Sequence, residues 1–475
     1  MNRDSPRASR DDARSYLLAL LAGLVEETRV EVRDPEAAAI IERAEKLARD
    51  LESADLRRFG PWQKAVHSYE SVADAVAAAR NSRARTARSY ESMEEMARDA
   101  EAQAKGKSPH AIWDAEEHGL RRQIERRIAD RFSAEDALLV NSGASAIAVA
   151  VGALRLGRGA TVLTGRHAHP ETTSFLTRYV APSGVKIVRA PLGHGDTVID
   201  ALRALRPELA LFETATAAPG SEVPSRVEEW FAASPSTTFV VDNTVQSLLT
   251  PWFARAPGPR RRLVVVESAA KYLSHRCMAG VVYGPEVLMG PIRDYARATG
   301  QHLQEKAFNY IRPAEIEQLR WKLTRHATNA RVFAAEAAGC LDIDVRLLDS
   351  EADPEARASL FANGPGCLVF VRLGARRDPA GGHRRLLAAF QAQARKRGAW
   401  VPVRAGFGWM DTTARIQEPT GERVDEGPRY LRVSVGIEPE HIVRDLGKAL
   451  RAASDEVCLS LGGAPGALGV DAAGR

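Results

Sequence analysis

The sequence predicts an α/β protein with a large, mostly parallel sheet domain, a smaller α+β C-terminal domain and a helical N-terminal extension. Three patterns support this prediction. Residues 11 to about 105 show helical periodicity, short apolar runs alternate with helix-like segments from about residue 120, and a second mixed segment covers roughly 340–455. Strands that alternate with helices pair in parallel, because each helix returns the chain across the sheet.

The N-terminal extension is expected to contain amphipathic helices. The apolar face of the first helix is formed by Leu17, Leu20, Leu21 and Leu24. The run Tyr16–Val25 is also similar to a signal-peptide core, but Glu26 and Glu27 follow at once and no small-residue cleavage site is present. It is too short to span a bilayer, so we expect a helix and no membrane partner.

Seven strands are expected in the large domain. They are Ala137–Val140, Ala160–Leu163, Val185–Val188, Leu209–Phe212, Thr238–Val241, Leu263–Val266 and Gly280–Tyr283. Pro313 suits the first position of a long helix, where its missing N–H costs nothing. Further strands are expected near Cys367–Leu373 and Leu431–Val435.

These elements divide the chain into four expected segments. They are a helical extension over 1–110, a large domain over 111–312, a small C-terminal domain over 313–455 and a tail over 456–475. The last residues of the tail are rich in Gly and Ala, and the tail is expected to be disordered.

Composition describes an ordinary globular protein. The chain has 475 residues, is 45% hydrophobic and 27% charged, and carries a net charge of only +5. The clusters Arg260–Arg262 and Arg384–Arg385 lack interleaved aromatic residues, so no nucleic-acid partner is expected. Four scattered cysteines show no metal-ligand spacing and no disulfide pattern, which favours a cytoplasmic protein without a metal: Cys277, Cys340, Cys367 and Cys458.

Lys271 is the most informative single residue. It lies within Val264–Val282, between a run that predicts a buried strand and a small strand that contains glycine. Burial disfavours the charged ammonium and lowers its pKa. The free amine that results can attack a carbonyl, so the position suits Schiff-base chemistry.

Asp242 completes a pair with this lysine. It ends the apolar run of Phe239–Thr244, about thirty residues before Lys271. An acid and a lysine at the ends of neighbouring parallel strands can hold opposite sides of one pyridine ring. The pair predicts pyridoxal 5′-phosphate (PLP), with Asp242 on the ring nitrogen and Lys271 on the aldehyde. Asp242 can also be read as a residue that only caps its strand.

The segment Asn141–Ala146 marks an expected phosphate site, where a strand enters a helix. Small residues let backbone N–H groups approach a phosphate, and the helix dipole favours the anion. A serine N-cap before an Ala-rich helix gives the same pattern without any ligand. This segment is therefore informative only in combination with others.

Five motifs in order resemble the Cys/Met-metabolism family of PLP-dependent enzymes, which includes cystathionine γ-synthase, cystathionine γ-lyase and methionine γ-lyase. The motifs are NSGASAI (141–147), ETATAAP (213–219), VVDNT (240–244), ESAAKY (267–272) and LRVSVGIE (431–438). The resemblance covers roughly 120–455 and leaves out residues 1 to about 105. It implies the fold-type I, aminotransferase-like architecture, with 111–312 as the PLP-binding domain.

The resemblance also implies roles for the matching residues. Lys271 would form the internal aldimine and then shuttle protons, while Asp242 would keep the ring nitrogen protonated. The phosphate would be bound by Ser142, Gly143, Ala144 and Ser268. Arg432 would bind the substrate α-carboxylate through two hydrogen bonds. Glu213 matches the glutamate that opens the family stretch E-[ST]-P-x-N-P, and both Arg432 and Glu213 can alternatively be structural.

The chain departs from the family around the cofactor. Ala217 replaces an asparagine that contacts the cofactor's phenolic oxygen, and Ala270 replaces a threonine. The family's ring-stacking tyrosine has no counterpart, so we expect His169 to stack on the ring, with His167 as the alternative. Both histidines can also be ordinary loop residues. A stacking histidine would titrate nearer neutrality and change the acid–base chemistry.

Two further departures affect the surroundings of the site. The Tyr-x-Arg motif that a neighbouring subunit contributes is not recognisable, and the candidates by composition are Arg83, Arg85, Arg88 and Tyr90. The family's Ser-Leu-Gly-Gly stretch is replaced by residues 404–415. There, Phe407, Trp409 and Thr412 are expected to shape a distinct substrate pocket.

The favoured hypothesis is an enzyme that carries out γ-elimination or γ-replacement through a vinylglycine quinonoid. Suitable substrates carry a γ-leaving group, as do O-acylhomoserine, S-adenosylmethionine or a γ-halo amino acid, and a role in specialised metabolism is expected. Transamination or β-elimination is the first alternative, because Lys271 and Asp242 serve these reactions equally. A non-catalytic scaffold is the second. The family resemblance implies a homodimer or homotetramer with shared active sites, and the N-terminal helices are expected to contribute to its contacts.

Overall fold

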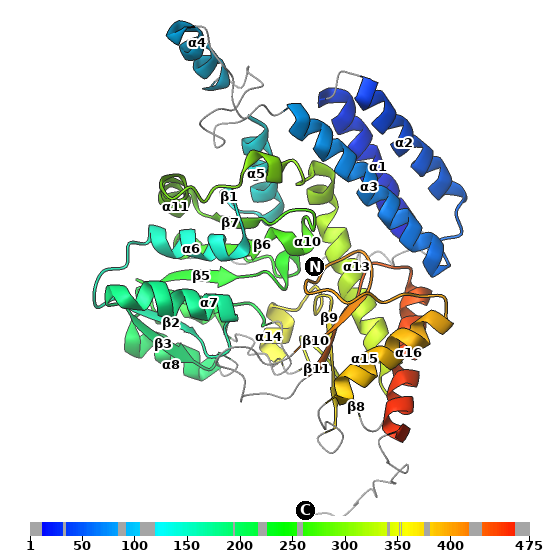
Figure 1. Cartoon of the computed structure of the whole chain (residues 1–475). Coiled ribbons are helices and arrows are strands. Elements are labelled where there is room, and N and C mark those ends of the chain that lie inside the picture. The colour runs from blue at the N-terminus through cyan, green and yellow to red at the C-terminus, as the bar shows by residue number, and fades with distance from the viewer. Residues whose placement is uncertain are drawn as a thin grey trace, which may run out of the picture.

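A computed structural model of the chain describes residues 12–31, 35–83, 92–104, 119–192, 195–216, 226–253, 260–339, 343–350, 352, 354–374, 381–417 and 430–460. These residues form a set of N-terminal helices, a large domain around a seven-stranded sheet and a smaller domain around a four-stranded sheet (Figure 1).

The large sheet confirms the predicted α/β class. In spatial order its strands are β1 (Asp136–Val140), β7 (Gly280–Gly284), β6 (Leu263–Ser268), β5 (Thr238–Asp242), β4 (Leu209–Glu213), β2 (Thr161–Gly165) and β3 (Lys186–Ala190). All seven predicted strands are present. The strands from β6 to β3 pair in parallel, whereas β7 is antiparallel to both of its neighbours. The sheet is therefore mostly parallel, and its carboxyl edge gathers the ends of β4, β5 and β6.

Helices cover both faces of this sheet, which explains the nearly continuous apolar strands. Leu138 and Val140 of β1 share one apolar cluster with α6 (Gly143–Ala153) and α11 (Glu286–Ala298). Their neighbours Ala137 and Leu139 point to the opposite face. That face is covered by α5 (Gly119–Phe132), α8 (Gly195–Leu205) and α9 (Val227–Ala233).

Shorter elements lie near the carboxyl edge of the sheet or link the strands. They are α7 (Pro170–Phe175), the π-helix η1 (Leu176–Val180), η2 (Ala181–Ser183), η3 (Ser247–Leu249), η4 (Arg260–Arg262), α10 (Ala269–Tyr272), α12 (Glu305–Phe308) and α14 (Pro354–Ser359). Of these, α7, η1 and α10 carry residues that line the cavity described below.

The small domain begins with the long helix α13 (Pro313–Ala337), and Pro313 takes the predicted first helical position. Its antiparallel sheet has the order β10 (Thr413–Gln417), β11 (Tyr430–Ser434), β9 (Leu368–Leu373) and β8 (Ile343–Leu347). The helices α15 (Gly382–Lys396) and α16 (Glu440–Ser460) pack against each other beside this sheet (Figure 1). The two strands expected in this domain are β9 and β11.

The N-terminal extension is helical, as predicted. It comprises α1 (Asp12–Glu31), α2 (Pro35–Ser53), α3 (Phe59–Arg83) and α4 (Met93–Ala104). The predicted apolar face of α1 is buried. Tyr16 stacks on Trp321 of α13 at 4.4 Å, and the Tyr69 hydroxyl donates to Glu315 at 2.9 Å. The helices α1 and α3 thus share one apolar cluster with the small domain.

The predicted segment boundaries remain predictions, although α16 continues to Ser460 and so enters the expected tail. Residues 461–475 of that tail lie outside the described residues. No helix in the described part of the chain is both long and apolar enough to cross a membrane. The cytoplasmic location and the part of the N-terminal helices in an oligomer also remain predictions.

Candidate active site

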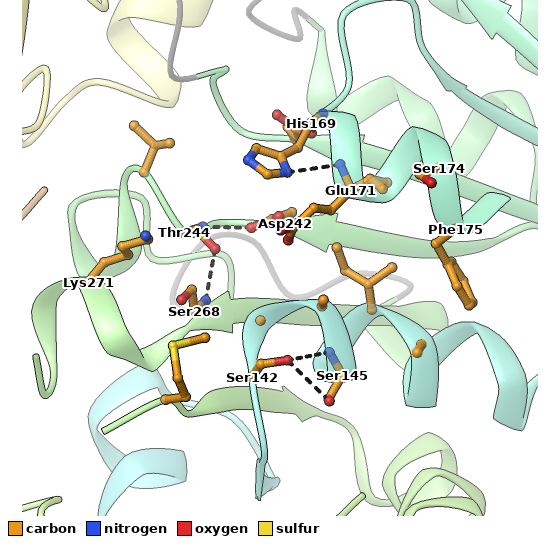
Figure 2. Close-up of a pocket in the computed structure, with 18 of the residues that line it drawn as sticks. Ser142, Ser145, His169, Glu171, Ser174, Phe175, Asp242, Thr244, Ser268 and Lys271 are labelled. Atoms are coloured by element: carbon orange, nitrogen blue, oxygen red, sulfur yellow. Dashed lines mark hydrogen bonds between the residues drawn. The ribbon is translucent and has the colours of Figure 1, made fainter. Parts of the chain in front are cut away.

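A cavity of about 750 Å³ lies where the carboxyl edge of the large sheet faces the small domain. It is lined by all nine residues predicted to bind the cofactor or the substrate carboxylate: Ser142, Gly143, Ala144, His169, Glu213, Asp242, Ser268, Lys271 and Arg432. They come from both domains and span almost 300 residues of sequence. Figure 2 shows the large-domain side of this cavity.

The N-terminus of α6 forms one end of the cavity. Ser142 caps the helix by accepting a hydrogen bond from the Ser145 N–H at 3.0 Å. The N–H groups of Gly143 and Ala144 belong to the first turn, where the helix supplies no acceptor. A Cβ on Gly143 would lie 2.9 Å from the Ser268 Cβ, and one on Gly280 would lie 2.1 Å from the Ser142 carbonyl oxygen. Glycine is therefore required for this close approach, which leaves backbone donors facing the cavity beside Ser268.

Asp242 is held at the end of β5 by Thr244. The Thr244 N–H donates to Asp242 Oδ1 at 2.9 Å, and the Thr244 hydroxyl accepts from the Ser268 N–H at 2.9 Å (Figure 2). Burial raises the pKa of Asp242, while the hydrogen bonds from Thr244 and the nearby His169 and Lys271 oppose that rise. A cationic ring nitrogen in the cavity would therefore favour the carboxylate form.

Lys271 lies on α10, three residues after β6 ends, and β5 and β6 are neighbouring parallel strands as predicted. Burial lowers the pKa of Lys271, and the Arg432 guanidinium lowers it further. Its Nζ lies 5.3 Å from the centroid of the Phe407 ring. The surroundings thus favour the uncharged amine, which is the form that reacts with an aldehyde.

His169 is oriented through its own backbone and through α7. Its N–H donates to the Glu213 carboxylate. Its Nδ1 accepts from the Glu171 N–H at 3.3 Å, as Figure 2 shows. Pro170 follows at the first position of α7. Glu213 pairs in register with Asp242, so the glutamate lies beside the aspartate at the same edge of the sheet. Glu213 therefore positions His169 at the cavity.

Arg432 supplies the opposite wall from β11. Its side chain is buried and donates to the carbonyl oxygens of Ala405 at 2.6 Å and Gly406 at 3.2 Å. Burial and the neighbouring Arg415 lower the pKa of Arg432 to about 10. Arg415 is its direct partner in the β10–β11 register, and both arginines line the cavity. Two guanidinium groups side by side make this wall strongly attractive to anions.

Several predictions about the surroundings are modified by the structure. Phe407 lines the cavity, whereas Trp409 and Thr412 are absent from its lining. Trp409 stacks on His275, and the Thr412 N–H donates to Glu438. His167 is likewise absent from the lining, which leaves His169 as the histidine at the site. Arg83 ends α3, but the other phosphate-binding candidates (Arg85, Arg88 and Tyr90) and Ala217 lie outside the described residues.

Among the cavity residues that the sequence did not predict, three have contacts or strand pairing that tie them to the predicted ones. Thr244 links Asp242 to Ser268, Glu171 lies beside His169, and Arg415 pairs with Arg432. Thr244 was within a recognised motif and could have been found, because a hydroxyl two residues after a strand-end acid can bind neighbouring backbone groups. Arg415 lacks any such signal, since only the folded register of β10 and β11 brings it beside Arg432.

The residues around this cavity fit PLP in their chemistry. A helix N-terminus with a nearby hydroxyl suits a phosphate, a buried carboxylate suits a ring nitrogen, and an amine with lowered pKa suits an aldehyde. The three features lie around one cavity.

Comparison with known proteins identifies the class. The model of the Cys/Met metabolism PLP-dependent enzyme family matches residues 70–336, which is more than half of the chain. The chain therefore belongs to this family of PLP-dependent enzymes. The match includes Lys271 and Asp242, but it leaves out most of the N-terminal extension and the part of the small domain that contains Arg432.

Solved structures agree on the fold. Two crystal structures of cystathionine γ-synthase from Xanthomonas oryzae pv. oryzae, one with aminoacrylate and cysteine and one with cystathionine, superpose with TM-scores of 0.58 and 0.59. In each case identity is 20%, and the alignment covers 72% of this chain and 86% of the other. The fold-type I architecture is confirmed. No curated protein sequence matches the chain significantly.

Proposed function

We propose that this PLP-dependent enzyme carries out γ-elimination or γ-replacement on an amino acid with a γ-leaving group. The observation that carries the proposal is one cavity that joins Lys271 and Asp242 to the carboxylate-binding candidate Arg432. Membership of the Cys/Met metabolism family and the likeness in fold to cystathionine γ-synthase support chemistry at Cγ.

The cofactor would be held by the large-domain wall. The α6 N-terminus and Ser268 would bind its phosphate, Asp242 its ring nitrogen and Lys271 its aldehyde, with His169 against the ring. When bound, PLP supplies an electron sink for the carbanion that forms when the Cα proton is removed.

The protein would bind the substrate through Arg432 and move protons through Lys271. Two parallel N–H donors of the guanidinium match a carboxylate, so Arg432 fixes the Cα–H bond relative to Lys271. The Lys271 amine would take the Cα proton, and its lowered pKa favours the basic form. After loss of a Cβ proton, the γ-substituent departs with its bonding electrons. Water then yields a 2-oxo acid and ammonia, or a nucleophile adds at Cγ.

The positive charge of the cavity wall on β10 and β11 favours some of the candidate substrates over others. Arg415 and Arg432 lie side by side on β10 and β11 and both line the cavity. A sulfonium substrate such as S-adenosylmethionine brings a positive charge toward these guanidinium groups, which is unfavourable. An O-acylhomoserine or a γ-halo amino acid brings no such charge. We therefore favour these two substrate types.

The test is a screen of γ-substituted amino acids with the PLP-loaded enzyme. O-acetylhomoserine, a γ-chloro amino acid and S-adenosylmethionine are each incubated with and without a thiol, and the released leaving group, 2-oxobutanoate and thioether are measured. We expect release from the first two and little from the third, with Lys271→Ala as the inactive control. Failure of all three to release a leaving group would reject chemistry at Cγ. Conversion of the cofactor to its amine form would instead support transamination.

A further inference from the structure

The loop of residues 404–409, between the small-domain helix α15 and strand β10, packs directly on the backbone that carries Lys271. Gly408 has φ of +80°, and a Cβ there would lie 2.6 Å from the Lys271 carbonyl oxygen. No other residue fits without displacing one of the two segments. The neighbouring Phe407 packs edge-on against Tyr272 at 5.6 Å and also faces the Lys271 amine. The loop is therefore one wall of the lysine's environment.

His275 contacts both this loop and the segment that carries Lys271. Its Nε2 lies 2.7 Å from the Gly408 carbonyl oxygen, and its Nδ1 lies 3.1 Å from the carbonyl oxygen of Ala270, the residue before Lys271. One imidazole thus lies between two carbonyl groups, one from each domain. Burial lowers the pKa of His275, so the neutral ring donates its single N–H to only one of them. Its ring stacks on Trp409 at 4.1 Å with an interplanar angle of 16°. The Arg404 guanidinium covers Trp409 at 4.3 Å from its centroid.

The lysine segment depends on such external contacts because α10 is a single turn. A helix of four residues leaves most of its carbonyl groups without helical partners. His275 contacts the Ala270 carbonyl, and the buried Lys322 donates to the Tyr272 carbonyl at 2.7 Å. The direction in which Lys271 leaves α10 is therefore determined by groups outside the helix.

The same loop accepts hydrogen bonds from Arg432 at its other end. The Arg432 guanidinium donates to the carbonyl oxygens of Ala405 and Gly406. A carboxylate bound by Arg432 would compete for these N–H groups, since a charged acceptor forms the stronger hydrogen bond. Carboxylate binding would then alter the contacts of the loop, and the loop contacts the Lys271 backbone through Gly408.

We propose that His275 and Trp409 are positioning residues, which hold the Lys271 amine in its reactive orientation and couple it to carboxylate binding at Arg432. The proposal rests on the proposed function, because it assigns Arg432 to the substrate carboxylate. Neither His275 nor Trp409 lines the cavity. Both act through the loop of residues 404–409 and the backbone of α10.

The test compares variants that break the stack with one that retains it. His275→Phe keeps an aromatic ring on Trp409 but removes both nitrogen contacts, Trp409→Ala removes the stack, and Trp409→Phe preserves it. We expect His275→Phe and Trp409→Ala to lower kcat by about 100-fold, as displaced catalytic groups do, with KM changed by less than about threefold. The pH midpoint of the bound cofactor's visible absorbance should also shift. Trp409→Phe should stay within about threefold of the native kcat.

A matched control is Trp400→Ala, which removes a tryptophan that is 46% exposed and outside the loop. It should leave kcat and the absorbance midpoint unchanged. A native kcat and a native absorbance midpoint in folded His275→Phe and Trp409→Ala would overturn the proposal. A purely structural role of the two residues predicts only a lower melting temperature. Should both fail to fold, Arg404→Gln removes only the outer layer of the stack, and an unchanged kcat and absorbance midpoint would then overturn it.

Labelling and turnover of the native protein distinguish failure of this inference from failure of the proposed function on which it rests. Borohydride labelling of Lys271 together with turnover of a γ-substituted amino acid would uphold the function, whatever the variants show. Turnover with unaffected variants would reject only the positioning of Lys271 by His275 and Trp409. Absence of both label and turnover would reject the function itself.

Discussion

The two walls of the cavity differ in how they are built. The large-domain wall places its groups at strand ends and at one helix N-terminus, and Thr244 connects Asp242 to Ser268. The small-domain wall consists of a loop and two antiparallel strands. The loop is held by Arg432 and by the contacts of Phe407 and Gly408 with α10. Four of the five motifs that resemble the family lie in the large domain, although Ala270 and His169 depart from the family there. The small domain keeps the motif that contains Arg432 but departs from the family in residues 404–415.

Asp242→Asn breaks the large-domain wall and should have the largest effect of the four substitutions considered next. It leaves the Thr244 contact possible but removes the negative charge that would stabilise a protonated ring nitrogen. We expect kcat to fall by about 100- to 1,000-fold, as for loss of one electrostatic partner of a transition state. Steady-state kinetics and cofactor absorbance measure the effect. A kcat within a few-fold of native would show that Asp242 only caps its strand.

Arg432→Lys breaks the small-domain wall. The lysine keeps a charge but loses the paired donors, so binding of a carboxylate is weakened and misoriented. We expect kcat/KM to fall by about 10- to 100-fold, the range for a lost charged hydrogen bond. PLP content should stay native, because the cofactor is held by the other wall. Loss of PLP in this variant would contradict the assignment of cofactor binding to the large-domain wall.

Arg415→Ala tests how the small-domain wall affects the pKa of Lys271. Arg415 is one of the cations that lower this pKa, so its removal should raise it. At a fixed pH, less of the apoenzyme then carries the neutral amine, and the pH dependence of PLP loading should move to higher pH. Stopped-flow loading across a pH series measures the midpoint. A midpoint that moves to lower pH would contradict the assigned electrostatics.

Glu438→Gln tests how a buried carboxyl group of the small domain affects stability at different pH values. Burial and the nearby Asp411 raise the pKa of Glu438 from its ordinary value of 4.5 to about 8, although the hydrogen bond that it accepts from the Thr412 N–H opposes the rise. The folded state therefore holds the proton more tightly, and the stability that this contributes is lost as pH rises through about 8. Glutamine stays neutral, so we expect a higher Tm than native at about pH 9 and little difference near pH 5. Equal Tm values at both pH values would contradict this.

The sequence predicted the fold and the large-domain wall because both depend on local patterns. Apolar runs indicated the strands, and Asp242 and Lys271 follow such runs directly. Residues whose role depends on long-range register were not predictable. Arg415 meets Arg432 only through the pairing of β10 with β11, and Tyr16 meets Trp321 only when α1 docks on α13. Trp409 was expected at the substrate pocket, but it turns inward onto His275.

The most direct measurement of the central claim is borohydride reduction of the PLP-supplied protein, followed by mass mapping of pyridoxyl-lysine. Lysines are scarce in this chain, and Lys271 and the buried Lys322 both lie near the site. The account predicts a label on Lys271 that disappears in Lys271→Ala while Lys322 stays unmodified. A label on any other lysine, or none at all, would contradict the assignment of the cavity as a PLP-dependent active site.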